Sequence, residues 1–307
     1  MFKVFIDGSA GTTGLKIFDR LKERRDINLI TLSEQLRKDV NARKDAINSA
    51  DVVFLCLPDS AAIESVSLVE NKNVKIIDTS TAHRTNPIWQ YGFAELDGNR
   101  EKIATSNKIA NPGCHASGFI ALVNPLINAG VIEKDINLTC FSITGYSGGG
   151  KKMIVEYESD SIPALYQAPR QYGLTQSHKH LPEMQKYCKL KDLPIFCPIV
   201  SNYDCGMEVT VPLFKKDVKC NLDQIKQIYQ DLYKTDVVKY VDANDENGFL
   251  SANSMKGKDS MEISVFGNED RILLVSRFDN LGKGASGAAI QNMNILLGVD
   301  EKTGLVL

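Results

Sequence analysis

The sequence predicts an α/β fold, with a doubly wound parallel sheet followed by a second domain of α+β type. The first third alternates short apolar runs with longer amphipathic segments, the pattern of βαβ units. A glycine-rich turn follows the first apolar run, and the pattern changes after residue 114. With 307 residues, 43% of them hydrophobic and 24% charged, the chain is long enough for two domains with buried cores.

The first domain is expected to alternate strands and helices along the chain. Apolar runs predict strands at Phe2–Ile6, Ile27–Leu32, Val52–Leu57 and Val74–Ile77. Amphipathic segments predict helices at Gly14–Arg24, Ser33–Asn48 and Asp59–Glu70, the last with Asp59 or Ser60 as its N-cap. This order is typical of a nucleotide-binding sheet with helices on both faces, so the first domain is expected to be Rossmann-like.

The second domain is expected to begin with a long helix after Cys114, because apolar residues recur at helical spacing up to Ile127. Further on, Met261–Phe266 and Arg271–Phe278 read as a hairpin joined by a four-residue turn. The segment Gly284–Leu297 again reads as a helix, and its small residues would let it pack on the first domain. We therefore divide the chain into residues 1–113 with 284–307, and residues 114–283.

Composition excludes several classes of protein. The 36 basic and 38 acidic residues nearly balance, and no run of five like charges points to nucleic acid or a membrane surface. The seven cysteines show no C-x-x-C pair, which indicates reduced thiols in the cytoplasm and no structural metal site. The first strand begins directly, and there is no 18-residue apolar stretch, so neither secretion nor membrane insertion is expected.

The glycine-rich turn runs from Gly8 to Gly14, between the first strand and the first helix. Glycines there permit a tight turn, and the amide groups at the helix start can bind a pyrophosphate. The spacing is G-x-x-G-x-x-G, and a plain βα turn is the alternative. The residues expected to bind a dinucleotide here are Gly8, Ser9, Gly11, Thr12, Thr13 and Gly14.

The end of the second strand points to NADP rather than NAD. An NAD site usually places an acidic residue there to bind the ribose 2′-hydroxyl. Here the strand ends in Thr31-Leu32-Ser33, with Arg37 and Lys38 one helical turn later. A hydroxyl and two cations suit a 2′-phosphate, so Ser33 and Arg37 are predicted cofactor ligands. The alternative is that the two cations only solvate a helix face.

Cys114 is the candidate nucleophile. It follows Asn111-Pro112-Gly113 and stands at the start of the predicted long helix. Unsatisfied amide groups and the positive end of the helix dipole favour a thiolate there, which lowers the pKa of the thiol. Three other cysteines read as small buried hydrophobic residues: Cys56, Cys140 and Cys197.

The segment His178-Lys179-His180-Leu181-Pro182-Glu183 holds two of the four histidines. A cysteine nucleophile needs a partner that takes and returns a proton near neutral pH, and imidazole suits that role. We take His180 as the acid–base because Glu183 would orient it if the segment turns helically, with His178 as the second candidate. A surface pair of histidines is the alternative.

Several segments together resemble the N-acetyl-gamma-glutamyl-phosphate reductase family, in its shorter form, within the semialdehyde dehydrogenase group. The N-P-G-C and H-x-H-x-P-E motifs are fairly specific in combination. The matching segments are Gly8–Gly14, Asp78–Arg84, Tyr91–Leu96, Asn111–Cys114, Gly145–Lys152, His178–Glu183 and Lys283–Gly287. Thr79, Thr81, Ala82 and His83 depart from the family's usual D-L-S-A-D-F-R.

The resemblance implies an NADPH-dependent reduction of a small acyl phosphate through a cysteine thioester, in arginine biosynthesis. It implies that Ser80 and Arg84 lie near the substrate phosphate, and that Gly284 and Ala285 contact the nicotinamide half of the cofactor. A homodimer or homotetramer is expected. The other predicted substrate ligands are Asn111, Ser147 and Gly148, while Lys151 and Lys152 either attract substrate anions or only begin a helix.

Two other functions remain open at this stage. A related enzyme would reduce a different acyl phosphate, of the aspartate-semialdehyde or amino-adipate type, because sequence spacing does not fix substrate length. A non-catalytic NADP-binding sensor could use the same fold. Cys114 and the histidine pair favour an enzyme over a sensor.

Overall fold

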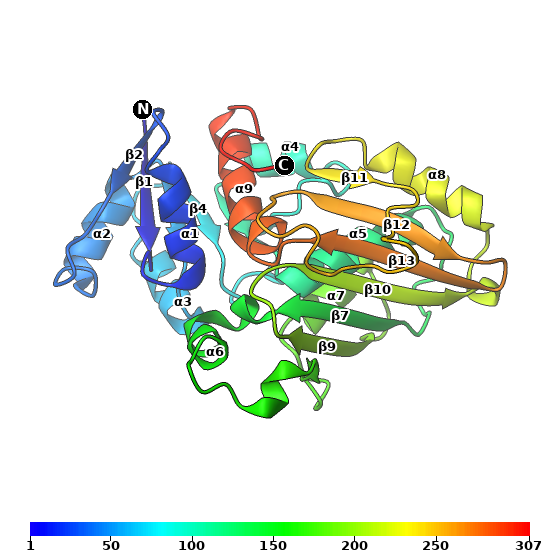
Figure 1. Cartoon of the computed structure of the whole chain (residues 1–307). Helices are drawn as coiled ribbons and strands as arrows, with labels where there is room; N and C mark the ends of the chain where they lie inside the picture. The colour runs from blue at the N-terminus through cyan, green and yellow to red at the C-terminus, as the bar shows by residue number, and fades with distance from the viewer. The chain divides into compact units, whose positions relative to one another are not determined.

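The structure is a computed structural model that describes residues 1–307. The chain forms two compact units (Figure 1). The first comprises residues 1–112 and 285–305, and the second comprises residues 113–284 and 306–307. None of the helices is both long enough and apolar enough to cross a membrane.

The first unit is built on a six-stranded parallel sheet in the order β2-β1-β3-β4-β6-β5. Its strands are β1 (Phe2–Asp7), β2 (Ile27–Ile30), β3 (Val52–Leu55), β4 (Lys75–Asp78), β5 (Gln90–Tyr91) and β6 (Lys108–Ala110). β2 lies on one side of β1, and β3, β4, β6 and β5 follow on the other, so the sheet extends from β1 in both directions, which confirms the doubly wound α/β prediction. All four strands expected in this unit are present.

Helices on the two faces of this sheet form two separate cores. The helices are α1 (Thr12–Leu21), α2 (Val40–Ser49), α3 (Asp59–Ser67), α4 (Asn99–Thr105) and α9 (Gly287–Leu297). Val4 and Ile6 of β1 pack with α1, α4 and α9, whereas Phe5 packs with α2 and α3. Successive residues of the strand therefore point into opposite cores, because side chains alternate between the two faces of a sheet. The C-terminal helix packs in this unit, as expected.

Two local predictions in this unit were wrong. The second helix begins at Val40 instead of Ser33, because residues 34–38 form turns in which the Leu36 and Arg37 amides bond to the Ser33 carbonyl. The N-cap of α3 is Pro58 instead of Asp59 or Ser60. The Asp59 carboxylate accepts the Thr81 amide at 2.9 Å and so serves a neighbouring loop.

The second unit is built on a seven-stranded mixed sheet in the order β11-β12-β13-β10-β7-β9-β8. The strands are β7 (Thr139–Gly145), β8 (Arg170–Gln171), β9 (Ile195–Ser201), β10 (Met207–Phe214), β11 (Val238–Tyr240), β12 (Met261–Gly267) and β13 (Arg271–Phe278). β12 and β13 are antiparallel neighbours, so the expected hairpin is present. Parallel and antiparallel pairs occur together, which confirms the α+β pattern expected for the chain after residue 114.

The helices of this unit include the long α5 (Cys114–Asn128), which packs on the sheet. The others are α6 (Gly150–Tyr157), α7 (Leu181–Cys188) and α8 (Leu222–Leu232), with short 3₁₀ segments at Tyr146–Gly149, Ala164–Gln167 and Lys215–Asp217. Gly118 allows α5 to lie close to the sheet, because a Cβ there would come within 2.5 Å of Val209 Cγ2. Figure 1 shows α5 and α7 on one side of this sheet and no helix over the other.

Candidate active site

The glycine-rich turn lines a cavity of about 690 Å³ in the first unit. The cavity lies over the carboxyl ends of β1 and β3, where ligands of doubly wound folds bind. Residues from several elements line it, among them Asp7, Gly8, Ser9, Ala10, Gly11, Leu32, Glu34, Arg37, Lys38, Cys56 and Pro58. The cavity's position and size suit a dinucleotide.

The turn needs glycine at two positions. Gly8 has a φ of +92°, and a Cβ there would lie 2.3 Å from the Cys56 carbonyl oxygen. A Cβ at Gly14 would lie 2.4 Å from the Gly8 carbonyl oxygen. α1 begins at Thr12 with Gly11 as N-cap and no side-chain cap, so its first amides remain available to an anion. Thr12, Thr13 and Gly14 form that first turn, directly after the residues that line the cavity.

At the end of β2, the cavity is lined by Thr31, Leu32, Glu34, Arg37 and Lys38, but Ser33 does not line it. Arg37 Nη2 lies 2.9 Å from Glu34 Oε1, and both side chains are exposed. Sequence reasoning did not consider Glu34. Its position one residue past Ser33 was a visible signal, since an acidic residue at this end of a strand is what binds a ribose hydroxyl.

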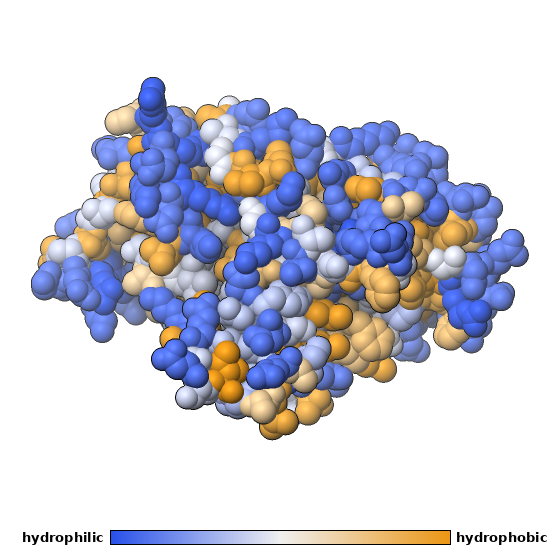
Figure 2. Space-filling view, in the orientation of Figure 1, coloured by the Kyte–Doolittle hydropathy of each residue, from blue (hydrophilic) through white to orange (hydrophobic).

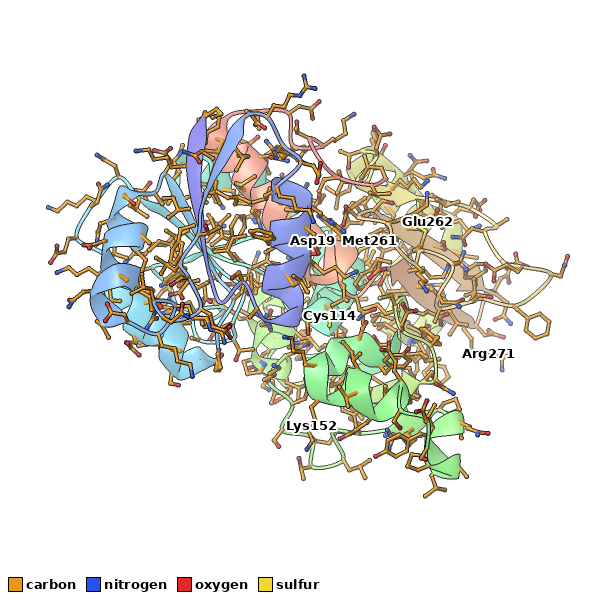
Figure 3. The ribbon with its side chains drawn as sticks, turned by 60° about the vertical axis from the view of Figure 1, so that its left-hand side comes forward. Asp19, Cys114, Lys152, Met261, Glu262 and Arg271 are labelled. Carbon is orange, nitrogen blue, oxygen red and sulfur yellow. The ribbon has the colours of Figure 1, made fainter.

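In the second unit, Cys114 is the first residue of α5 (Figure 3), as expected. Gly113 is the N-cap and has no side chain to satisfy the first amides of the helix. The Gly113 amide itself donates to Glu183 Oε2 at 3.0 Å. Glu183 is 1% exposed and belongs to α7, so a buried carboxylate fixes the backbone immediately before Cys114.

Three polar side chains converge at the start of α5. The Cys114 sulfur and one ring nitrogen each of His115 and His180 lie within 4.8 Å of one another. The His178 ring is 4.7 Å from that of His180 and nearly perpendicular to it, so both histidines of the H-x-H motif belong to this cluster. The structure therefore brings together the residues that the sequence analysis assigned to catalysis: Cys114, His178, His180 and Glu183.

His115 was missed by sequence reasoning, although it follows Cys114 directly. It is buried, with Nδ1 2.6 Å from Ser142 Oγ and Nε2 2.7 Å from the Tyr172 hydroxyl. Burial, and then the nearby His178, lower the pKa of His115 to about 3. His115 is therefore neutral at physiological pH and does not titrate there.

Cys114, His115 and His180 are also residue types that bind thiophilic metal ions. Both ring nitrogens of His115 are engaged by hydroxyl groups, however, and a metal would have to displace one of them. The hydrogen-bonded arrangement agrees better with a thiol nucleophile beside an acid–base partner. Burial and nearby Cys114 also raise the pKa of Tyr172, so this phenol stays protonated.

Other cysteines are kept protonated by burial. Burial raises the pKa of Cys56 to about 12, and it also raises the pKa of Cys140 and Cys188. Cys56 packs against the core of the first unit. Cys197 is only half-buried. The raised pKa values make Cys56, Cys140 and Cys188 poor nucleophiles, whereas Cys114 lies beside two histidines and is the reactive candidate.

The segment after β4 places the Ser80 hydroxyl and the His83 ring against the buried carboxylate of Asp78. Asp78 Oδ2 accepts the Ser80 hydroxyl at 2.8 Å and lies 2.6 Å from His83 Nδ1. His83 stacks on Trp89 with a ring separation of 4.1 Å. Arg84 is buried and donates to the Thr79 carbonyl at 2.9 Å. His83, which departs from the family pattern, thus helps to fix this loop.

Asn111 and Ala285 lie together in the first unit. The Asn111 side-chain amide donates to the Ala285 carbonyl at 3.0 Å and accepts from Asn292 Nδ2 of α9 at 3.1 Å.

Gly284 belongs to the second unit, in the short π-helix Gly282–Ser286. A Cβ on Gly284 would lie 2.9 Å from Cys114 Cβ, so this glycine lets the chain pass directly beside the nucleophile.

Ser147 and Gly148 lie in the 3₁₀ segment that precedes α6. Ser147 is buried; its hydroxyl donates to the Asp204 carbonyl and accepts from Asn280 Nδ2 at 3.0 Å. Lys151 and Lys152 are exposed on the first turn of α6. Figure 3 labels Lys152 on this helix. The Ser147 bonds fix the segment before α6, and the two lysines add positive charge at its start.

Two family models match the two parts of the chain. Residues 3–106 match the NAD-binding domain of semialdehyde dehydrogenases. Residues 114–280 match the dimerisation domain of the same enzymes. The first match agrees with the glycine-lined cavity, and the second places the cysteine–histidine cluster in the dimerisation domain.

Named relatives and solved structures extend this finding. The chain is 44% identical over 318 residues to N-acetyl-gamma-glutamyl-phosphate reductase 2 of Nostoc sp., with 99% of each chain covered. It is 45% identical over 306 residues to N-acetyl-gamma-glutamyl-phosphate reductase of Brucella ovis, which covers 96% of this chain and 99% of that one.

The fold is also that of aspartate semialdehyde dehydrogenase II from Vibrio cholerae, at a TM-score of 0.72, 16% identity, and coverage of 97% of this chain and 98% of that chain. This last likeness concerns the fold alone. The identity over nearly the whole length to the reductases is decisive for the family. The chain belongs to the N-acetyl-gamma-glutamyl-phosphate reductases, within the semialdehyde dehydrogenase family.

Proposed function

We propose that the protein reduces N-acetyl-gamma-glutamyl phosphate to N-acetylglutamate 5-semialdehyde with release of phosphate, as a step of arginine biosynthesis. The observation that carries the proposal is the Cys114 sulfur at the start of α5, within 4.8 Å of a ring nitrogen of His180. A thiol nucleophile with an imidazole partner suits acyl transfer. The names of the relatives specify the acyl phosphate.

In the first half-reaction, the Cys114 thiolate attacks the carbonyl carbon of the acyl phosphate. The C–S bond forms as the C–O bond to phosphate breaks, and inorganic phosphate leaves with the bonding electron pair. The product is a thioester on Cys114. Amides at the start of α5, including that of Cys114, are placed to stabilise the developing oxyanion.

His180 serves as the acid–base in both halves of the reaction. It takes the proton of the Cys114 thiol before attack. After the thioester is reduced, it protonates the carbonyl oxygen and takes that proton back as the C–S bond breaks, which releases the aldehyde and the Cys114 thiolate. His178 lies against it and is the second candidate for this role. Glu183 acts as a positioning residue, because its carboxylate fixes Gly113 at the head of the nucleophile's helix.

Arg84 and Ser80 are the proposed ligands of the substrate phosphate, because a guanidinium binds phosphate oxygens in a bidentate manner. The bonds of Ser80 to Asp78 and of Arg84 to the Thr79 carbonyl set the shape of this loop. Asn111, Ser147 and Gly148 remain proposed substrate ligands. Their backbone and side-chain bonds hold them in ordered segments.

The cofactor proposed is NADP(H), held by Gly8, Ser9, Gly11 and the first turn of α1. The turn has no room for a Cβ at Gly8 or Gly14, and the first amides of α1 have no side-chain cap. Both features suit the binding of a pyrophosphate. NADPH supplies the hydride when it is bound. Arg37 and Lys38 line the same cavity and favour a 2′-phosphate, although the bond between Glu34 and Arg37 would have to open to free the guanidinium.

We also propose that the open face of the second sheet binds a second copy of the chain. Phe141, Ile195 and Leu273 are between 40% and 58% exposed there. Figure 2 shows apolar residues gathered over β7, β9 and β10. The match of residues 114–280 to a dimerisation domain supports a second copy of the chain as the partner. Phe141→Asp should convert the oligomer to a monomer in light scattering; an unchanged mass would contradict this interface.

The activity is tested in the reverse direction, with N-acetylglutamate semialdehyde, phosphate and NADP⁺. We expect phosphate-dependent formation of reduced cofactor, faster with NADP⁺ than with NAD⁺, and its loss in Cys114→Ser. Aspartate semialdehyde and the amino-adipate analogue serve as competing substrates. Comparable turnover of either would overturn the substrate assignment, and cofactor binding without any turnover would favour a sensor.

A further inference from the structure

A buried ion pair lies beneath the glycine-rich turn and takes no part in the reaction proposed above. Asp7 is the last residue of β1, directly before Gly8, and is 4% exposed. Arg43 of α2 is 7% exposed. Its Nε and Nη2 atoms lie 3.2 Å and 3.1 Å from the same oxygen of Asp7, so the guanidinium binds the carboxylate through two N–H groups.

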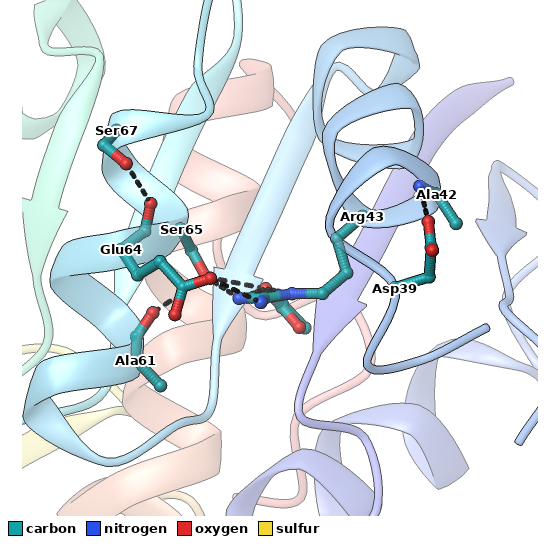
Figure 4. Close-up of polar contacts among 8 residues, drawn as sticks. Asp39, Ala42, Arg43, Ala61, Glu64, Ser65 and Ser67 are labelled. Carbon is teal, nitrogen blue, oxygen red and sulfur yellow. Dashed lines mark hydrogen bonds and ion pairs between the residues drawn. The ribbon is translucent and has the colours of Figure 1, made fainter. Parts of the chain in front are cut away.

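Two residues of α3 complete this arrangement (Figure 4). The fully buried Ser65 hydroxyl donates to Asp7 Oδ2 at 2.8 Å and accepts from Arg43 Nη2 at 2.5 Å. Arg43 Nη1 also donates to Glu64 Oε1 at 3.2 Å. The end of β1 is thereby tied to both helices on its side of the sheet.

Asp7 lines the cavity that the glycine turn encloses, whereas Arg43 does not. An unpaired carboxylate at this position would repel the phosphate groups of a dinucleotide, because like charges interact strongly in a poorly solvated site. With Arg43 bound to it, the negative charge of Asp7 is balanced by the guanidinium on the side away from the cavity lining.

We infer that Arg43 is a positioning residue for the cofactor: it neutralises Asp7 under the glycine-rich turn and so permits the phosphates of NADP(H) to bind. The inference rests on the proposed function only in taking this cavity as the cofactor site. Arg43 acts through Asp7 and does not touch the reacting atoms.

The test is the affinity for NADPH, measured by fluorescence titration of the whole protein without substrate. Arg43→Met should raise the Kd by about tenfold or more, because it leaves the carboxylate charged and unpaired. Asp7→Asn should not weaken binding, and the double variant Asp7→Asn with Arg43→Met should return the Kd to within about threefold of the wild-type value.

Arg24→Met is the matched control. Arg24 has a side chain that is only 6% exposed and pairs with Asp26, but neither residue lines the cavity. Arg24→Met should lower the melting temperature while leaving the Kd for NADPH unchanged. An unchanged Kd in Arg43→Met, or a double variant as weak as the single one, would overturn the inference.

If Arg43→Met does not fold, Asp7→Asn and the double variant still decide the matter. A double variant that folds and binds NADPH normally supports charge neutralisation, and weak binding by either overturns it. A wild-type protein that binds neither NADPH nor NADP⁺ would instead refute the proposed cofactor site, which is a separate result.

Discussion

Replacing Glu183 by Gln tests whether the carboxylate beneath the nucleophile's helix supports catalysis. The side chain is 1% exposed and its Oε2 accepts the Gly113 amide at 3.0 Å. A hydrogen bond to a charged group contributes about 1.5–3 kcal/mol, and a neutral one about 1 kcal/mol. The variant keeps an acceptor but loses the charge, so we expect a loss of roughly 1 kcal/mol in unfolding free energy and a drop of about 2–4 °C in melting temperature.

The turnover of Glu183→Gln should fall by about tenfold, although the protein stays folded. A small shift of the helix start displaces the Cys114 sulfur from the acyl carbon. Asp259→Asn is the matched control. Asp259 is also 1% exposed, belongs to the same unit and accepts the Val306 amide at 2.9 Å instead of the amide next to Cys114. Calorimetry and the reverse assay are run on both variants. Equal turnover in the two would refute the role assigned to Glu183.

Three further predictions follow from single residues. Gly8→Ala, at a φ of +92° with a Cβ 2.3 Å from the Cys56 carbonyl, should raise the Kd for NADPH at least about tenfold in fluorescence titration; an unchanged Kd would speak against the phosphate-binding turn. The pKa of His115 is about 3 when folded, against 6.5 in the unfolded chain, so the unfolded state takes up the proton first as pH falls. Wild type should therefore lose about 3 kcal/mol between pH 6.5 and 4 in urea titrations, and His115→Gln should lack this component; equal slopes would contradict the buried neutral imidazole. Gly284→Ala, whose Cβ would lie 2.9 Å from Cys114 Cβ, should lower kcat by about tenfold, and a normal kcat would contradict the close approach of Gly284 to the nucleophile.

The sequence was sufficient for the fold class because its two periodicities are local. Runs such as Val52–Leu57 alternate with amphipathic segments, and the carboxyl end of β1 is followed at once by glycines. The start of α2 was misjudged for the opposite reason. Residues 33–39 carry helix-forming side chains, but the Ser33 carbonyl closes a turn and Asp39 provides the real N-cap, accepting the Ala42 amide at 2.8 Å.

The residues of the candidate site could be predicted only where the nearby sequence carries a recognisable motif. Cys114 at a helix start and the pair His178 and His180 have such local signals. His115 does not, since its partners Ser142 and Tyr172 lie 27 and 57 residues away and only the folded sheet brings them together. The pairing of Asp7 with Arg43 across 36 residues is likewise a product of tertiary packing.

The central claim is that Cys114 forms a thioester with the acyl group, and the most direct measurement is the mass of the intact protein. Protein mixed with N-acetyl-gamma-glutamyl phosphate in the absence of cofactor is quenched in acid and analysed by mass spectrometry. We expect the mass of one N-acetylglutamyl group on wild type, released by hydroxylamine and absent from Cys114→Ser. No adduct on folded wild type, or an equal adduct on Cys114→Ser, would contradict the account.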